Sequence, residues 1–245
     1  MVRSERMLNV STVSPSERKE WCACSSGPGY LLVRRLQSLS GIAFGLYIFV
    51  HLSVNATIIQ GGGVFAKQVE KIHSLPFLVA IEWGTLLLPF IFHSIYGIWI
   101  LVNSQPNVSA YPTQRNAYYL LQRITAVAIF LFVLFHVLAF KYGAFGVNFK
   151  FDPFADQAGT VSRHLHMGNW VVIVYLIGIL VTAFHTANGF STAGITWGAT
   201  ISKASQRRLS LICVGAFVAL LALGYTALFA AMNTTPVELV VSMMQ

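Results

Sequence analysis

The chain has 245 residues, of which 56% are apolar and only 10% are charged, and its formal net charge is +8. About a quarter of the residues of a typical soluble domain are charged, so this composition excludes a soluble domain and indicates an integral membrane protein. Three scattered cysteines, Cys22, Cys24 and Cys213, are too few for a disulfide framework, and a lone Cys-x-Cys pair is weak evidence for a metal site.

Five apolar runs are each long enough for a membrane span of about 20 residues. Backbone groups inside lipid must be satisfied within the segment, so we expect helices and an all-α membrane protein. The first thirty residues are polar and charged, which predicts no cleaved signal peptide. We therefore expect a tail at 1–29, a transmembrane domain at 30–235 and a short tail at 236–245. The expected spans are Leu36–Ile59, Leu78–Val102, Tyr119–Phe140, Met167–Phe190 and Leu209–Met232.

The basic residues predict the orientation. Eleven lie in the N-terminal tail, the second and fourth connections or the span ends beside them, and five in the first and third connections. Cytoplasmic segments carry the excess of Lys and Arg, so we expect a cytoplasmic N-terminus and an external C-terminus. This distribution explains the positive charge by topology rather than by nucleic acid. The long first and third connections, Gln60–Phe77 and Lys141–His166, contain Gly, Pro and mixed charge, which predicts exposed loops.

Four of the five spans each carry one interior histidine within an A-B-A-B repeat. A Phe-His-[Ser/Thr]-x-x-Gly pattern surrounds His93 and recurs around His185. Gln37 precedes His51 by 14 residues, and Gln122 precedes His136 by 14. Histidine inside a membrane is costly and is a functional-site hypothesis by default.

Depth in the membrane sorts these histidines into two layers. At 1.5 Å per residue, His51 and His136 lie about 20–24 Å from the inner face, whereas His93 and His185 lie about 14–15 Å from it. The layers are then about 5–10 Å apart. Each layer has two imidazoles from different helices, which can hold one haem iron from both sides. A haem with both axial positions filled transfers electrons rather than binding substrate.

Other interpretations of the histidines are weaker. A proton relay normally brings acids into the helix middles, and the middles of the expected helices contain none. A zinc or copper site gathers its ligands around one ion, whereas these histidines lie in two layers. Gly97 and Gly189 lie four residues after their histidines on the same helix face, where a missing side chain gives a flat macrocycle room. Basic residues near the membrane faces, Arg123 among them, are natural partners for haem propionates.

A set of short motifs between Tyr30 and Ala230 is highly specific when taken together. They are Arg34-Arg35-Leu36-Gln37-Ser38-Leu39-Ser40-Gly41, His51-Leu52-x-Val54-Asn55, Ser74-Leu75-Pro76-Phe77, Leu88-Pro89-x-x-x-His93-x-x-Tyr96-Gly97, Leu121-Gln122-Arg123-Ile124-Thr125, Phe184-His185-x-x-Asn188-Gly189, and Thr196-Trp197-Gly198 followed by Ser205-Gln206-Arg207. This set resembles the cytochrome b subunit of succinate dehydrogenase or fumarate reductase, in its single-chain, five-helix, two-haem form.

The resemblance implies two haem b groups, with His51 paired to His136 and His93 paired to His185. It implies a bacterial cytoplasmic membrane and two partners on the cytoplasmic face, a flavoprotein carrying FAD and an iron–sulfur subunit carrying its clusters. Electrons from succinate would pass through the inner and outer haems to a quinone, typically menaquinone. A higher oligomer of the complex is possible, and no nucleic acid is expected.

The chain departs from the family pattern in two places. Relatives often have His at the position of Gln37, and glutamine can supply only polar contacts. Some two-haem fumarate reductases place an acid just before the fourth histidine, where this chain has Thr182, Ala183 and Phe184. The resemblance therefore favours succinate oxidation, with quinol:fumarate reduction as the alternative.

The quinone site rests on fewer signals. Glu82, the only acid within an expected span, is a candidate for quinone protonation, and an interfacial carboxylate is the competing interpretation. Arg34 and Ser38 are candidates for a second site on the inner side. The outer connections gather further candidates that are either propionate partners or ordinary loop residues: Glu70, His73, Arg163, His164 and His166.

Two other functions stay open from the residues alone. One is the dihaem membrane subunit of another enzyme, such as a formate dehydrogenase or hydrogenase, and the other is a proton-coupled transporter built on repeats. Copurification with a flavoprotein distinguishes the first from a succinate dehydrogenase, and absence of haem absorbance would favour the second.

Overall fold

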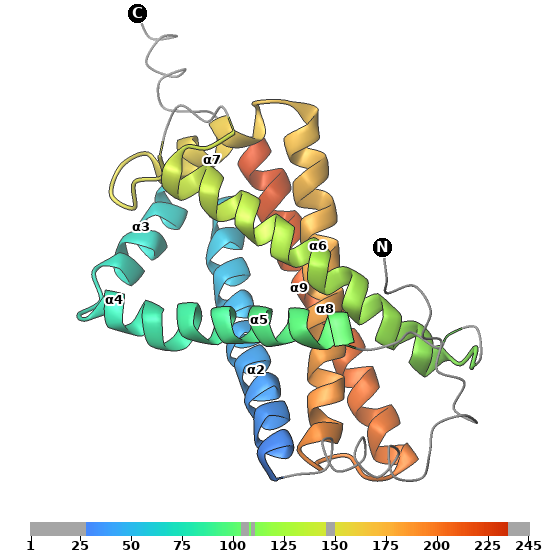
Figure 1. The fold of residues 1–245 in the computed structure, drawn as a ribbon. Coiled ribbons are helices and arrows are strands. Elements are labelled where there is room, and N and C mark those ends of the chain that lie inside the picture. The colour runs from blue at the N-terminus through green and yellow to red at the C-terminus, as the bar shows by residue number, and fades with distance from the viewer. Residues whose placement is uncertain (1–27, 104–107, 109–110, 146–149, 235–245) are drawn as a thin grey trace, which may run out of the picture.

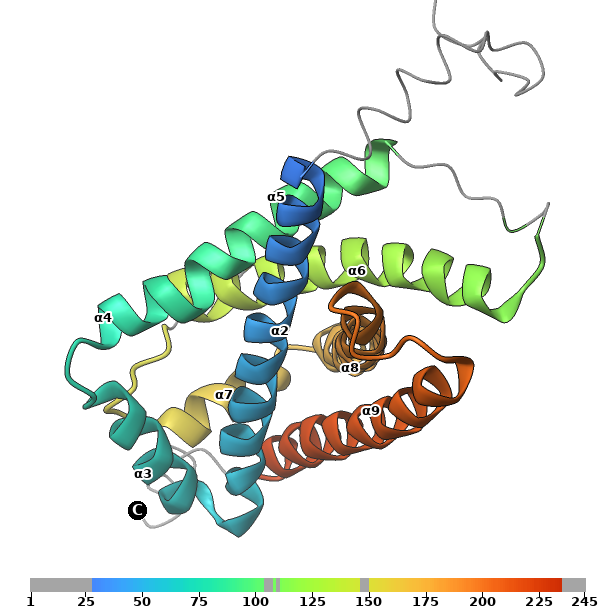
Figure 2. The same cartoon turned by 90° about the horizontal axis from the view of Figure 1, so that it is seen from below.

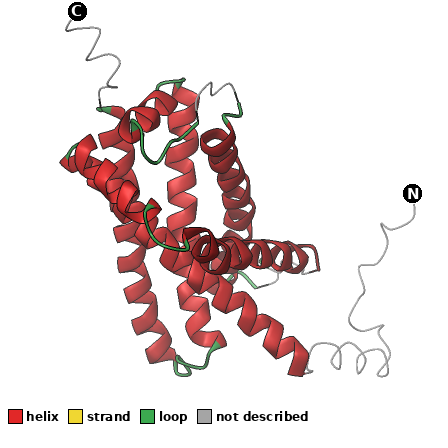
Figure 3. Cartoon of the chain, turned by 90° about the vertical axis from the view of Figure 1, so that its left-hand side faces the viewer, coloured by secondary structure: helices red, strands yellow, loops and turns green. Residues whose placement is uncertain are grey.

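The computed structural model describes residues 28–103, 108, 111–145 and 150–234. The expected tails, apart from their few residues within these ranges, and the Cys22–Cys24 pair lie outside them. In the described part of the chain the regular structure is helical (Figure 3), and the pairing of Asp152 with Ala155 is an isolated bridge outside any strand. The prediction of an all-α protein is confirmed.

Among the residues that the structure describes, five helical segments are long and apolar enough to cross a membrane, which confirms the predicted number of spans. Each of them runs past the expected range at one end or both, because polar and basic residues at the apolar ends continue the helix. The segments are α2 (Pro28–Ala56) with η1 (Thr57–Gln60), then α4 (Leu78–Ile81), η2 (Glu82–Leu87) and α5 (Leu88–Asn103) as one span, α6 (Gln114–Tyr142), α8 (Asn169–Thr196) and α9 (Lys203–Met232).

The second span changes its helical pitch part-way. Its segment η2 is a π-helix that ends directly before Leu88-Pro89. Proline has no N–H and its ring displaces the carbonyl four residues before it, so a wider turn accommodates Pro89 without ending the helix. Single π turns inside α-helices are frequent at functional sites.

The prediction that both long connections are exposed loops is wrong for part of each. The first contains α3 (Gly62–His73) and the third contains α7 (Gln157–Leu165). Their Gly and Pro residues lie mainly at the ends, whereas apolar residues at helical spacing, such as Phe65 and Val69 on α3, are buried. Helix α7 is buried along most of its length. Both helices lie at the end of the bundle where α9 finishes (Figure 1), here called the α7 end.

Close packing of α8 forms the centre of the bundle. A Cβ added at Gly224 of α9 would lie 2.5 Å from Ile179 of α8, and one at Gly45 of α2 would lie 2.8 Å from Phe190 of α8. Small residues allow this close approach of helices in membranes. By contrast, α5 crosses α2 at a steep angle (Figures 1 and 2) and has no fully buried residue.

Candidate functional site

His93 of α5 and His185 of α8 face each other between their helices. Their ring centroids are 6.4 Å apart and their planes are inclined by 82°. The Nδ1 atom of His93 lies 3.1 Å from the carbonyl oxygen of Gln37, and that of His185 lies 3.1 Å from the carbonyl oxygen of Gln122. When Nδ1–H donates to a carbonyl, the lone pair of Nε2 is free for a metal.

The same contacts surround both of these histidines. The Gln37 side-chain amide donates to the backbone oxygen of His93 at 3.1 Å, and the Gln122 amide donates to that of His185 at 3.1 Å. The hydroxyls of Ser40 and Thr125 lie 3.3 and 3.2 Å from the respective Nδ1 atoms. The polar role expected for Gln37 is therefore what the structure shows.

Sequence reasoning missed Ser40 and Thr125. The signal was present, because each follows its glutamine by three residues within the repeated segment. The two sets differ at one point: Asn188 donates to Gln122 Oε1 at 2.8 Å, whereas Gln37 Oε1 is buried without a hydrogen-bond partner among the described residues. Tyr96 occupies the position that corresponds to Asn188.

His51 of α2 and His136 of α6 form the second pair. Their ring centroids are 6.0 Å apart with planes inclined by 85°. The His51 ring lies over that of Tyr47 at 5.6 Å between centroids. The Nδ1 atom of His136 lies 2.9 Å from the hydroxyl of Tyr175, which in turn lies 3.2 Å from Nε2 of His164.

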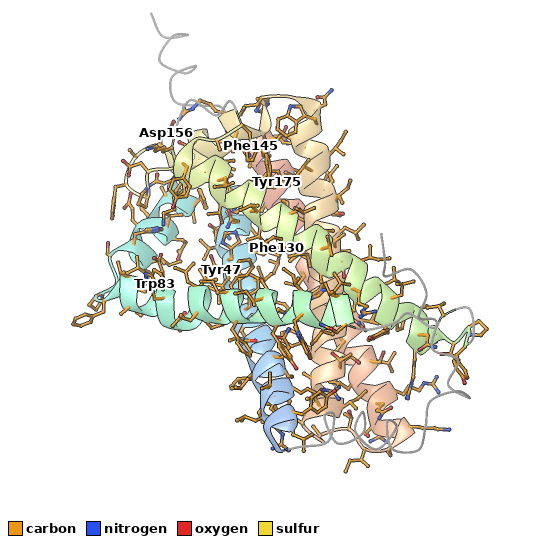
Figure 4. All side chains as sticks on the ribbon, in the orientation of Figure 1. Tyr47, Trp83, Phe130, Phe145, Asp156 and Tyr175 are labelled. Carbon is orange, nitrogen blue, oxygen red and sulfur yellow. The ribbon has the colours of Figure 1, made fainter. Side chains whose placement is uncertain are left out.

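A cavity of about 510 Å³ opens beside this second pair. Both histidines line it, together with His73 of α3, with Leu86 and Leu87 of η2, and with mainly apolar and aromatic side chains from α2, α3, α5, α6, α7, α8 and α9. Tyr47, Phe130 and Tyr175, labelled in Figure 4, belong to its wall. His93 and His185 are not part of this lining.

The spacing within each pair suits one metal ion held from both sides. A metal–imidazole bond is about 2 Å long, and the nitrogen lies about 1 Å from its ring centre, so two such bonds in line separate the centroids by about 6 Å. The observed separations are 6.0 and 6.4 Å. Within the described residues, no three His, Cys, Asp or Glu side chains gather into a set that could hold a metal ion, so each site offers two ligands.

The two pairs are further apart than the depth count predicts. The His93 ring lies against Gly41 of α2, and His51 follows ten residues later on the same helix. At 1.5 Å per residue these levels are about 15 Å apart along α2, not about 5–10 Å. The depths were counted in residues from the inner face, which assumes that all spans are parallel and end in one plane. Helix α5 is instead strongly tilted relative to α2 (Figure 1).

Glycines near the first pair have different surroundings. A Cβ at Gly41 would lie 2.7 Å from Cε1 of His93, so this glycine makes room for the imidazole. At Gly97 and Gly189 the nearest atoms to an added Cβ are the amide nitrogens of Gln37 and Gln122, at 3.5 and 3.6 Å. These are ordinary contacts, so the protein itself leaves room for a methyl group there.

Replacing Gly97 by alanine tests whether a macrocycle lies against it. The protein around Gly97 tolerates a methyl group, so any change must come from a bound group that occupies the same space. We expect the Gly97→Ala variant to assemble normally and to shift the absorbance of one bound chromophore only. A spectrum identical to that of the unaltered protein would show that no macrocycle contacts Gly97.

The remaining candidates lie at the periphery of these pairs. Glu82 is exposed and is not part of the cavity lining. His166 is exposed, and its Nδ1 lies 2.8 Å from the backbone oxygen of Ser162 within its own turn. His164 is 1% exposed, and its burial lowers its pKa to about 4. It is therefore neutral at physiological pH.

Three candidates lie at the opposite end of the bundle, and two of them, Arg123 and Ser38, bond residues outside their own helix. Arg123 donates to the backbone oxygen of Ile100 at 3.1 Å, while its buried Nε has no hydrogen-bond partner within the described ranges. The hydroxyl of Ser38 accepts from Trp197 Nε1 at 3.1 Å. Arg34 is exposed and lies over the ring of Tyr30.

Comparison with known proteins decides the family. Residues 103–224 match the model of the succinate dehydrogenase/fumarate reductase transmembrane subunit. The succinate dehydrogenase cytochrome b558 subunit of Bacillus subtilis (strain 168) is 34% identical over 207 residues, which cover 84% of this chain and 98% of that protein. The chain belongs to this family.

As a succinate dehydrogenase/fumarate reductase transmembrane subunit, the chain is a multi-pass membrane protein and the cytochrome b component of an oxidoreductase complex. Membership in this family decides against the transporter and against the subunit of a formate dehydrogenase or hydrogenase. A match that covers 84% of the 245 residues necessarily includes all four of the paired histidines, which lie between positions 51 and 185.

Proposed function

We propose that this chain anchors a succinate dehydrogenase complex and conducts electrons through two haem b groups to a quinone. His93 and His185 hold the inner haem, and His51 and His136 hold the outer one. The observation that carries the proposal is the presence of two isolated imidazole pairs with centroid separations of 6.4 and 6.0 Å. The relative from Bacillus subtilis is named as a cytochrome.

The residues fit a haem at each pair for separate reasons. At the inner pair, carbonyls of Gln37 and Gln122 accept from Nδ1 and leave Nε2 for the iron. At the outer pair, the apolar cavity of about 510 Å³ provides space for a macrocycle. The Nδ1 atom of buried His164 has no partner among the described residues, and a haem propionate would accept its hydrogen.

A bound haem supplies reversible one-electron transfer at its iron. The four histidines would supply two protein ligands to each iron, which would leave no open site for oxygen or substrate. Gln37 and Gln122 fix the ring orientation of the inner ligands through paired contacts to side chain and backbone. The apolar wall of the outer cavity excludes water, which keeps the outer centre away from bulk solvent.

The proposed cytoplasmic face is the end of the bundle where residues 197–202 connect α8 to α9, opposite the α7 end. Exposed basic residues gather there, and Arg115 of α6 bonds Gln206 of α9 at 2.5 Å. A positive surface steers and orients an acidic partner, so we place the iron–sulfur subunit, with the flavoprotein beyond it, on this face. The α7 end then faces the outside of a bacterial cytoplasmic membrane, in the predicted orientation.

Quinone chemistry is proposed beside the outer haem, with menaquinone as the expected acceptor. Glu82 begins the π-helical segment whose later residues Leu86 and Leu87 line the cavity. An exposed carboxylate at this position is available to exchange protons with water and with a quinone. Arg34 and Ser38 keep their place as candidates for a second site near the cytoplasmic face.

The proposed direction is succinate oxidation. Thr182, which precedes His185 by one helical turn, is buried and carries no ionisable group, so the acid that some fumarate reductases place there is missing. Fumarate reduction with quinol is the alternative.

Purification of the chain with its copurifying subunits tests the function directly. We expect a flavoprotein and an iron–sulfur subunit to be present and the haem absorbance to be reduced on adding succinate. Reduction should require both partner subunits and be lost when they are stripped from the membrane. A haem spectrum that succinate leaves fully oxidised in the intact complex would contradict the proposal.

A further inference from the structure

We propose that Tyr175 and His164 are positioning residues for His136, and that their hydrogen-bonded chain lowers the reduction potential of the outer haem. The inference deepens the proposed function and rests on it. It assigns a role to Tyr175, which the sequence reasoning missed, and a more specific one to His164. Neither residue belongs to the four-histidine repeat.

The outer pair lacks the support that holds the inner pair. Each inner ligand has a backbone carbonyl within 3.1 Å of its Nδ1. His136 has instead the phenolic oxygen of Tyr175, at 2.9 Å. Metal-ligating histidines generally donate their second N–H to an outer-shell acceptor. The Tyr175 oxygen is this acceptor for His136, as the Gln122 carbonyl oxygen is for His185.

The direction of the hydrogen bonds follows from ligation. If Nε2 of His136 binds iron, the proton of the neutral ring is on Nδ1 and donates to the Tyr175 oxygen. The hydroxyl hydrogen of Tyr175 is then free to donate to Nε2 of His164, 3.2 Å away. His164 accepts because it is neutral: burial lowers its pKa to about 4. Its own proton is consequently on Nδ1, the buried atom without a partner among the described residues.

Aromatic packing holds the hydrogen-bonded side chains of His136, Tyr175 and His164 in place. His164 is 1% exposed, and its ring centroid lies 4.6 Å from that of Phe140 and 5.6 Å from that of Tyr175. Phe132 packs edge-on against Tyr175 at 5.4 Å. Figure 4 labels Tyr175 in the part of the bundle toward the α7 end. Because α7 carries His164 and α8 carries Tyr175, the connection between the spans reaches the proposed haem ligand through these two side chains.

The chemical effect has a definite sign. An acceptor on Nδ1–H raises the basicity of the ligand and so stabilises the oxidised, more positive iron. Removing the acceptor should favour the reduced state. A single hydrogen bond contributes a factor of about five to an equilibrium constant, so we expect the equilibrium constant for reduction to rise about fivefold, which corresponds to about 41 mV for a one-electron couple at 59 mV per tenfold change.

The test uses the intact succinate dehydrogenase complex and the Tyr175→Phe variant, which removes only the hydroxyl. Redox titration followed by absorbance should show two haems, an outer potential raised by the amount that a fivefold change corresponds to, about 41 mV, and an unchanged inner potential. The electron paramagnetic resonance signal of the oxidised outer haem, which depends on the angle between its imidazole planes, should also shift. Tyr225→Phe is the matched control, because the Tyr225 hydroxyl bonds the backbone of Leu176 outside the cavity lining.

A second pair of variants separates positioning from packing. His164→Leu removes the acceptor of the Tyr175 hydroxyl and should raise the outer potential by less than Tyr175→Phe does. His164→Gln keeps an acceptor for this hydroxyl, so its outer potential should lie close to that of the unaltered complex. Should Tyr175→Phe lose the outer haem, the two His164 variants carry the test, since the His164 ring packs against Phe135, Phe140 and Tyr175 and reaches His136 through the Tyr175 hydroxyl. Equal outer potentials and resonance signals in the unaltered, Tyr175→Phe and His164→Leu complexes would overturn the inference. A complex with no outer haem before any substitution would overturn the proposed function itself.

Discussion

Replacing His93 by alanine is expected to remove the inner haem and to leave the outer one in place. The His51–His136 cavity shares no ligand with His93, so the outer spectrum should persist at half of the original haem content. Loss of outer-shell partners alone costs about 10–100-fold in metal affinity or activity, so loss of the ligand should slow quinone reduction by succinate at least 100-fold. Absorbance spectra and succinate:quinone assays of the purified complex measure both effects.

The reciprocal change separates the two haems. His51→Ala should remove the outer haem while succinate still reduces the inner one, because in the proposed path the inner haem receives electrons from the iron–sulfur subunit first. Leu211→Ala is the control, since Leu211 is exposed on α9 and is not part of the cavity lining. Retention of two full haem equivalents in His93→Ala would refute the ligand assignment.

Alanine at Gly41 is expected to disrupt the inner haem without removing any ligand. The new Cβ would lie 2.7 Å from Cε1 and 3.1 Å from Nδ1 of His93. The imidazole cannot turn aside while its Nδ1 is held by the Gln37 carbonyl, so the ring or the helix must move. Overpacking of this kind costs about 1–3 kcal/mol. We expect partial loss of the inner haem and a shifted potential for what remains, measured by redox titration.

Gly215 provides the control for this substitution. It lies on α9 with no atom within 4 Å of an added Cβ, so Gly215→Ala should leave both haems, their potentials and the assembled complex unchanged. A Gly41→Ala complex that matches Gly215→Ala in haem content and both potentials would show that the close approach of His93 to α2 is unnecessary for haem binding.

The sequence was most informative where one physical constraint dominates. Lipid requires long apolar helices, and the five runs appear as five helices. The repeated spacing also brought the right histidines together, since residues 14 apart from equivalent glutamines lie at equivalent levels of α2 and α6. The helices in the long connections were missed because Gly and Pro at their ends obscured the short apolar periodicity of Phe65 and Val69.

Tilt and side-chain direction depend on packing that a linear count cannot contain. The layer separation was underestimated because α5 crosses α2 steeply (Figure 1). The contact of Tyr175 with His136 and His164 joins residues on three helices with no shared spacing. Gly97 and Gly189 were singled out as small residues near histidines, yet the glycine that lies against the His93 imidazole in the folded chain is Gly41.

The haem content of the purified complex, measured against the amount of this chain, tests the central claim most directly. Two isolated imidazole pairs predict two haem b per chain, each low-spin in both redox states because both axial positions are filled. A content of one haem or none per chain, or a high-spin haem with an open axial position, would contradict the account.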